Sequence, residues 1–140
     1  MTEEGLNEVR HLTARIKQEE ERLQRLKDWI TRLTQEIDGL PHDHSFPQSS
    51  IESLTVQIVD CEANIQRLIL DRTVSKSRLI KDIDFEVADN DAKSVLVERY
   101  GFGRSYSDIS KLLHTSESRI FALHRQGLKA LGIKGKLKAN

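Results

Sequence analysis

The sequence contains few of the residues that mark redox, membrane or catalytic function. Its 140 residues include one cysteine, two prolines, seven glycines and only 5% aromatic residues. Because Cys61 is alone, a disulfide within the chain is excluded and a reducing compartment is favoured. No apolar run approaches the length of a membrane span, and there is no glycine-rich phosphate loop or clustered catalytic triad. These absences predict a soluble cytoplasmic protein that is not an enzyme and uses no cofactor.

The charge of the chain is balanced in total but unevenly distributed. Lysine and arginine together number 22, as do aspartate and glutamate, so the formal net charge is zero. From Arg99 to Asn140, however, nine basic residues stand against two acidic ones, a local charge of +7 that the rest of the chain offsets. This asymmetry predicts that the C-terminal third contacts a polyanion and that an acidic body is attached to it.

The first third of the chain has apolar residues at alternating steps of three and four. Glu19 is the one polar residue in this series, and Trp29 beside it is expected to be a packing anchor. The series is Val9, Leu12, Ile16, Glu19, Leu23, Leu26, Ile30, Leu33, Ile37 and Leu40. A period of 3.5 residues sustained this long predicts a helix with a coiled-coil seam, which Gly39 and Pro41 end.

A second long helix is predicted from about Ser50 to about Val87. Ser49 and Glu52 fit a capping box at its start. The spacing shifts around Arg72, where we expect a bend or a change of packing. Two long helices joined by the short loop "PHDHSFPQ" should fold back as an antiparallel hairpin over residues 1–88. Because this hairpin is thin, it is expected to form a homo-oligomer, with a dimer favoured. The predicted seam residues are Leu23, Leu26, Ile30, Leu33, Ile37, Ile51, Leu54, Ile58, Cys61, Ile65 and Leu68.

The last part of the chain, residues 89–140, has short-range start and stop signals. Asp89 and Asn90 offer caps for one short helix, and Ser105 offers a cap for a second helix from about Tyr106 to Leu113. Ser116 then caps a third helix, which Gly132 ends. No stretch alternates with period two, so the expected fold class is all-α, with no sheet.

The two last helices are separated only by the turn at His114 and Thr115, which predicts a helix-turn-helix unit that binds double-stranded DNA. The small side chain of Ser110 lets the helices cross closely. Their expected shared core consists of Ile109, Leu113, Ile120, Leu123 and Leu128. In such a unit the outer side of the last helix, near its start, enters the major groove.

This geometry gives two groups of candidate DNA contacts. The base-reading candidates are Glu117, Ser118, Arg119, Phe121, Ala122 and Arg125. The phosphate candidates lie at helix starts or carry positive charge. They are Arg104, Ser105, Tyr106, Ser107, Lys111, Ser116, Lys129, Lys134, Lys136 and Lys138.

The stretch "VLVERYGFGRSYSDISKLLHTSESRIFALHRQGLKALG" resembles region 4 of sigma-70-type factors, the helix-turn-helix that recognises the promoter −35 element. The whole chain is similar to small phage-encoded transcriptional regulators of the ArpU/RinA type. This resemblance implies a late-gene transcription activator in the cytoplasm of a bacterial host that contacts host RNA polymerase. It also implies base contacts from positions 117, 118, 121 and 122. Glu117, Ser118 and Ala122 differ from the basic or amide residues common there, and His114 replaces the usual turn glycine.

Several alternatives stay open at this level. In the first alternative the protein is a DNA-binding repressor rather than an activator. In the second it is a structural coiled-coil adaptor with a degenerate helix-turn-helix. His124 either faces the recognition surface or packs against the preceding helix, and Phe121 either touches a thymine methyl or is half-buried. The histidines of "PHDHS" lack further metal-ligating partners, so no metal is expected. Cys61, on an apolar stripe, is expected to be a small core residue rather than a nucleophile.

Overall fold

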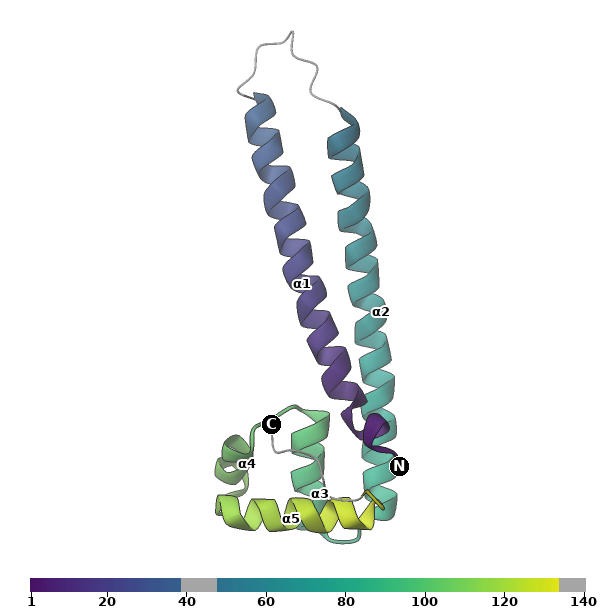
Figure 1. The fold of residues 1–140 in the computed structure, drawn as a ribbon, viewed down its shortest axis with the longest axis vertical. Coiled ribbons are helices and arrows are strands. Elements are labelled where there is room, and N and C mark those ends of the chain that lie inside the picture. The colour runs from purple at the N-terminus through teal and green to yellow at the C-terminus, as the bar shows by residue number, and fades with distance from the viewer. Residues whose placement is uncertain (39–47, 134–140) are drawn as a thin grey trace. The chain divides into compact units, whose positions relative to one another are not determined.

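The computed structural model describes residues 1–38 and 48–133, and within these ranges every regular element is helical (Figure 1). The predicted all-α class is therefore confirmed for this part of the chain. The elements are α1 (Glu3–Asp38), α2 (Gln48–Glu86), α3 (Asn90–Leu96), the π-helix η1 (Val97–Gly101), α4 (Tyr106–Leu113) and α5 (Glu117–Ala130). The predicted loop, with its histidines His42 and His44, lies outside the described residues, as does the end of the first apolar series at Leu40.

The chain forms two compact units. One consists of Thr13–Asp71, and the other combines Met1–Leu12 with Arg72–Asn140. We call them the hairpin unit and the C-terminal unit. The predicted division at residue 88 differs from these boundaries, because Val87 is buried in the core of the C-terminal unit. The assignment of oligomerisation to residues 1–88 and DNA binding to residues 89–140 stays a prediction.

The core of the hairpin unit contains residues of the predicted seam. Its buried members are Leu26, Leu54, Cys61 and Ile65, and Leu23, Ile30, Leu33, Ile58 and Ile69 pack against them. Leu68 is also buried, whereas Ile37 and Ile51 are half-buried. Within this unit α1 and α2 run in opposite directions (Figure 1). Residues of the two predicted seams thus pack against one another within one chain.

The polar interruption at Glu19 has a specific partner in this core. The thiol of Cys61 donates to the main-chain oxygen of Glu19 at 3.4 Å and to its carboxylate Oε2 at 3.5 Å. Burial raises the pKa of the Cys61 thiol, and the hydrogen bond to the Glu19 carboxylate raises it further. A thiol that stays protonated is a poor nucleophile. The interpretation of Cys61 as a small core residue therefore fits its surroundings.

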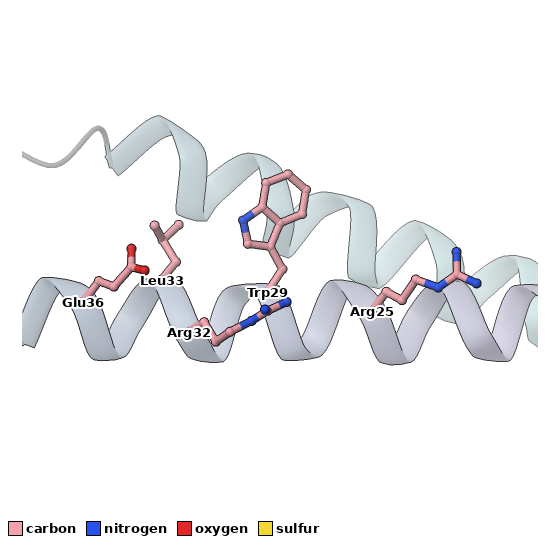
Figure 2. Close-up of a pocket in the computed structure, with 5 residues that line it drawn as sticks. All are labelled: Arg25, Trp29, Arg32, Leu33 and Glu36. Atoms are coloured by element: carbon pink, nitrogen blue, oxygen red, sulfur yellow. The ribbon is translucent and has the colours of Figure 1, made fainter.

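Trp29 is not the packing anchor expected from the sequence. Its side chain is 56% exposed. Successive residues of an α-helix point about 100° apart, so Trp29 points well away from the direction of its neighbour Ile30. The indole therefore lies beside the seam formed by Leu26 and Ile30. Figure 2 shows the indole projecting away from the α1 backbone. It lines a pocket of about 430 Å³ whose lining residues all come from this helix. They are Arg25, Trp29, Arg32, Leu33 and Glu36.

The core of the C-terminal unit draws on both ends of the described chain. Leu6 and Val9 of α1 are buried in it together with Leu79, Ile83 and Val87 from the end of α2. The remaining buried members come from the short helices and the residues after them. They are Ala92, Val95, Leu96, Tyr100, Tyr106, Ile109, Ile120, Leu123, Leu128, Leu131 and Ile133. One core therefore positions α3, α4 and α5.

Side-chain caps start the three short α-helices where the sequence predicted. The Asp89 carboxylate accepts from the N–H of residue 91, the Ser105 hydroxyl from residue 108, and the Ser116 hydroxyl from residue 119. Each cap satisfies an amide of the first turn that has no partner within its helix. In contrast, α2 begins at Gln48, so Ser49 lies inside the helix and not at the predicted cap position.

Gly127 is the point of closest approach between α3 and α5. A methyl group added at Gly127 would lie 2.6 Å from Cδ1 and 2.9 Å from Cγ of Leu96, which is completely buried. We therefore expect Gly127→Ala to destabilise the C-terminal unit by about 1–3 kcal/mol, since neither helix can shift without disturbing the core. Urea unfolding followed by circular dichroism measures this loss.

Gly101→Ala is the matched control for that substitution. Gly101 is also buried, but an added methyl group would meet only Cγ1 of Val97, at 3.8 Å, an ordinary van der Waals distance. We expect the change in unfolding free energy to stay within about 1 kcal/mol. Equal losses for the two variants would contradict close helix packing as the role of Gly127.

Candidate nucleic-acid interface

The turn between α4 and α5 is held by the backbone and by one serine. His114 adopts the left-handed conformation, with φ 52° and ψ 44°, as expected for a residue in the place of a turn glycine. The N–H of Thr115 donates to the main-chain oxygen of Ser110 at 3.0 Å. The hydroxyl of Ser110 donates in return to the oxygen of Thr115. The sequence predicted only that the small side chain of Ser110 lets the two helices cross closely. Its hydrogen bond to Thr115 also holds the turn in place.

Apolar side chains fix the angle between α4 and α5. Ile109 and Ile120 are 0% exposed, and Leu123 and Leu128 are also buried. Leu113 is partly buried and packs against the same core. The five residues predicted to form the shared core of these helices therefore do so.

The base-reading candidates divide into exposed and half-buried residues. Glu117, Ser118, Arg119 and Arg125 are exposed on α5, whereas Ala122 is half-buried. Phe121 is also half-buried, and its ring packs against that of Tyr106 with 4.7 Å between centroids. This contact favours the packing interpretation of Phe121, and it leaves the first turn of α5 and Arg125 as the accessible polar surface.

The start of α4 presents the exposed residues Ser105 and Ser107. Tyr106 between them was a phosphate candidate, and this assignment is wrong for its side chain. Tyr106 is 8% exposed, and its hydroxyl lies 3.3 Å from Nε2 of His124 in the core. Successive side chains of an α-helix point about 100° apart, so the residue next to an exposed serine can point inward.

The remaining phosphate candidates in the described part are all exposed, but two of them have partners within the chain. Nε of Arg104 lies 2.7 Å from the Glu98 carboxylate, so a phosphate must compete with this ion pair. The hydroxyl of Ser116 accepts the capping hydrogen bond from the N–H of Arg119. Lys111 and Lys129 are exposed on α4 and α5. The predicted contacts of Lys134, Lys136 and Lys138 lie outside the described residues.

Behind this surface lies a buried polar cluster that sequence reasoning did not anticipate. Nε2 of His124 is 2.6 Å from the hydroxyl of Tyr100, and the two rings stack. The imidazole also meets the ring of Tyr106 edge-on, with 5.4 Å between centroids. His124 thus packs against preceding helical elements, which decides between its two interpretations. Only the unusual concentration of aromatic and basic residues in "RYGFGRSY" hinted at such a cluster.

The electrostatics of the cluster favour a neutral imidazole. Burial and, to a lesser extent, the nearby charges of Arg99 and Arg125 together lower the pKa of His124 from 6.5 to about 4. Burial also raises the pKa of the Tyr100 hydroxyl, so it stays protonated. A neutral imidazole nitrogen accepts a hydrogen bond from a tyrosine hydroxyl, whereas a protonated one adds a second buried cation beside Arg99.

Arg99 connects the cluster to the segment that precedes α4. Its guanidinium lies 4.4 Å from the centre of the Tyr106 ring, and Nη1 donates to the main-chain oxygen of Arg104 at 3.1 Å. Nε of Arg99 is buried without a hydrogen-bond partner in the described part of the chain. Because Arg99 is only 6% exposed, one of the nine basic residues counted in the sequence is structural rather than available to a polyanion.

Comparison of the chain with protein-family models, curated proteins and solved structures found no match. Among the described residues, no three His, Cys, Asp or Glu side chains are grouped as metal ligands. No helix in that same part of the chain has the length and apolar character needed to cross a membrane.

Proposed function

We propose that this protein is a sequence-specific, double-stranded DNA-binding transcription regulator in which α4 and α5 form a helix-turn-helix. The observation that carries the proposal is the pairing of a fixed turn with an exposed polar first turn on α5. The outer side of α5, with Ser118, Arg119 and Arg125, enters the major groove, which is wide enough for one helix. Ser105 and Ser107 at the start of α4 contact the phosphate backbone.

The electrostatic balance supports this assignment of roles. Exposed Arg104, Lys111, Arg119, Arg125 and Lys129 belong to the C-terminal unit. Arginine recognises guanine edges through two parallel hydrogen bonds, while lysine and the helix starts position the protein on the backbone. Glu117 restricts the DNA sequences that α5 can bind, because a glutamate can accept a hydrogen bond from cytosine N4 but repels phosphate.

In the proposed arrangement, α1 and α2 form a coiled-coil hairpin that brings two helix-turn-helix units together. A dimer then binds two half-sites about one helical turn, roughly 34–36 Å, apart or a multiple of that spacing. Transcription activation of phage late genes, with contact to host RNA polymerase, is the regulatory role implied by the resemblance to ArpU/RinA-type regulators. A transcription assay with purified polymerase separates activation from repression by the sign of the change.

The direct test is an electrophoretic mobility shift with fragments of the source genome at about 50 and 200 mM salt. We expect one fragment to be bound more tightly than random DNA, with affinity falling as salt rises by a slope of about −0.9 per phosphate contact. An unrelated coiled-coil protein of similar charge serves as the control. Absence of any binding at the lower salt concentration would reject the DNA-binding proposal and favour the adaptor alternative.

A further inference from the structure

Helix α2 has apolar residues on two opposite faces within the hairpin unit. One face contributes Leu54, Cys61 and Ile65 to the core shared with α1. Val56, Val59 and Leu70 lie elsewhere on α2 and are 58%, 59% and 67% exposed. The interior of the hairpin therefore leaves some of the apolar side chains of this helix uncovered.

The exposed residues lie on one side of the helix. At about 100° per residue, Val56, Val59, Ala63 and Leu70 fall within an arc of roughly 60° on the side of α2 opposite the α1 contact. Their steps of three, four and seven match the repeat of helices that pack along their length. We call these four residues the outer α2 face. A helix that is apolar on both sides is normally covered on both.

The charges beside the outer α2 face specify how a second helix can cover it. Asp60 and Arg67 are both exposed and lie two turns apart along the same edge of this face. Nη2 of Arg67 donates to Oδ1 of Asn64 at 2.6 Å, which holds the guanidinium along the helix. Asp60 precedes Ala63 by three residues, and Arg67 follows it by four, so the two charges are nearly symmetric about Ala63.

We propose that a second copy of this chain docks on the outer α2 face, with its own α2 antiparallel and centred on Ala63. A two-fold axis through this point brings Asp60 of each copy beside Arg67 of the partner subunit. Val56 then faces Leu70 of the partner subunit, since each is seven residues from the centre. A parallel arrangement would instead place these charged edges of the two copies on opposite sides of the seam, where Asp60 and Arg67 of different copies could not pair.

The pattern fits a copy of the same chain because a two-fold interface uses one surface patch twice, and this patch is complementary to itself. Ala63 at the centre has a small side chain, which permits close approach of the two helix backbones. Together with α1 of each copy, the two α2 helices make a four-helix arrangement. This inference gives a surface for the proposed homo-oligomer and does not depend on DNA binding.

Charge reversal on the full-length chain tests the proposal in the absence of DNA. Sedimentation equilibrium should show a dimer of the natural protein, and Asp60→Lys or Arg67→Glu alone should weaken it about tenfold by placing like charges together. The double variant Asp60→Lys with Arg67→Glu should restore dimerisation, since the opposite pairs are regenerated. Val59→Glu should weaken the dimer without being rescued by either change.

Lys17→Glu and Glu21→Lys are the matched controls, because both residues are exposed on α1 and their changes carry the same charges. Circular dichroism verifies that every variant remains helical. A monomeric natural protein would overturn the proposal, as would a dimer indifferent to Val59→Glu. Single reversals without effect, or a double variant as weak as the singles, would overturn the antiparallel pairing. Since the measurement contains no DNA, its failure leaves the mobility-shift result to decide the proposed function separately.

Discussion

Lowering the pH from 7 to 5 is expected to reduce the free energy of unfolding of the C-terminal unit by about 2 kcal/mol through His124 alone. The pKa of His124 is lowered in the folded protein from 6.5 to about 4. Its ring is 5% exposed and lies between Tyr100, Tyr106 and the charge of Arg99. Protonation in the folded state would therefore place a cation in a desolvated site beside another cation.

The direction follows from which state takes up the proton first. Between pH 6.5 and 4 the unfolded chain binds a proton at His124 that the folded chain does not, so stability rises with pH over this interval. The contribution is complete above pH 6.5 and is lost as the pH falls toward 4. Urea unfolding at pH 7, 6 and 5, followed by circular dichroism, measures the slope.

His124→Gln separates this effect from the titration of carboxylates. The variant should be less stable at pH 7, because its packing against Tyr100 changes, but its pH dependence between 7 and 5 should be flatter than that of the natural protein. His11→Gln is the control, since His11 is exposed on α1. The same slope in His124→Gln and the natural protein would contradict a buried neutral imidazole.

The second large effect is expected at the proposed DNA surface. Arg119→Glu combined with Arg125→Glu should weaken binding to the preferred fragment at least about 100-fold. Two positive side chains are replaced by groups that repel phosphate, and a lost arginine–base pair alone costs about 1–3 kcal/mol. Both residues are exposed, so the fold should be retained. Fluorescence anisotropy with labelled DNA at fixed salt measures the loss.

The matched control is Arg78→Glu combined with Lys81→Glu, which changes the total charge by the same amount as the arginine pair. Both residues are exposed on α2 and belong to the same C-terminal unit. We expect this control to reduce affinity much less. Single Arg119→Ala then distinguishes base reading from backbone contact, because a base contact affects the preferred fragment more than random DNA. If the control pair were as damaging as the arginine pair, α5 would not be the surface that enters the groove.

The parts of the fold that sequence reasoning predicted well are those specified by neighbouring residues. Ser105 and Ser116 start α4 and α5 because a hydroxyl three residues before a free amide is a local arrangement. His114 turns the chain because few other residues enter the left-handed region. The apolar repeats that contain Leu26 in α1 and Leu54 and Ile65 in α2 likewise indicate the buried face of each helix through spacing alone.

The features that escaped prediction depend on contacts between distant segments. Beyond the aromatic and basic residues of "RYGFGRSY", no local signal indicates that the polar atoms of Tyr106 and His124 meet inside a core. The ring contact of Arg99 is likewise not specified by its neighbours in sequence. Trp29 and the outer α2 face escaped prediction for a different reason. The hydrophobicity of a helix does not specify which of its faces a neighbouring helix will cover. The π-helix η1 also depends on packing rather than on a local signal.

The core of the C-terminal unit joins residues that are far apart along the chain, and this has a consequence for biosynthesis. Leu6 and Val9 precede Ala92 and Val95, with which they share one core, by more than 80 residues. Closing such a long loop is entropically costly and slows folding. Since α5 is translated last among the described helices, the first turns of α1 can pack into this core only after most of the chain has been synthesised.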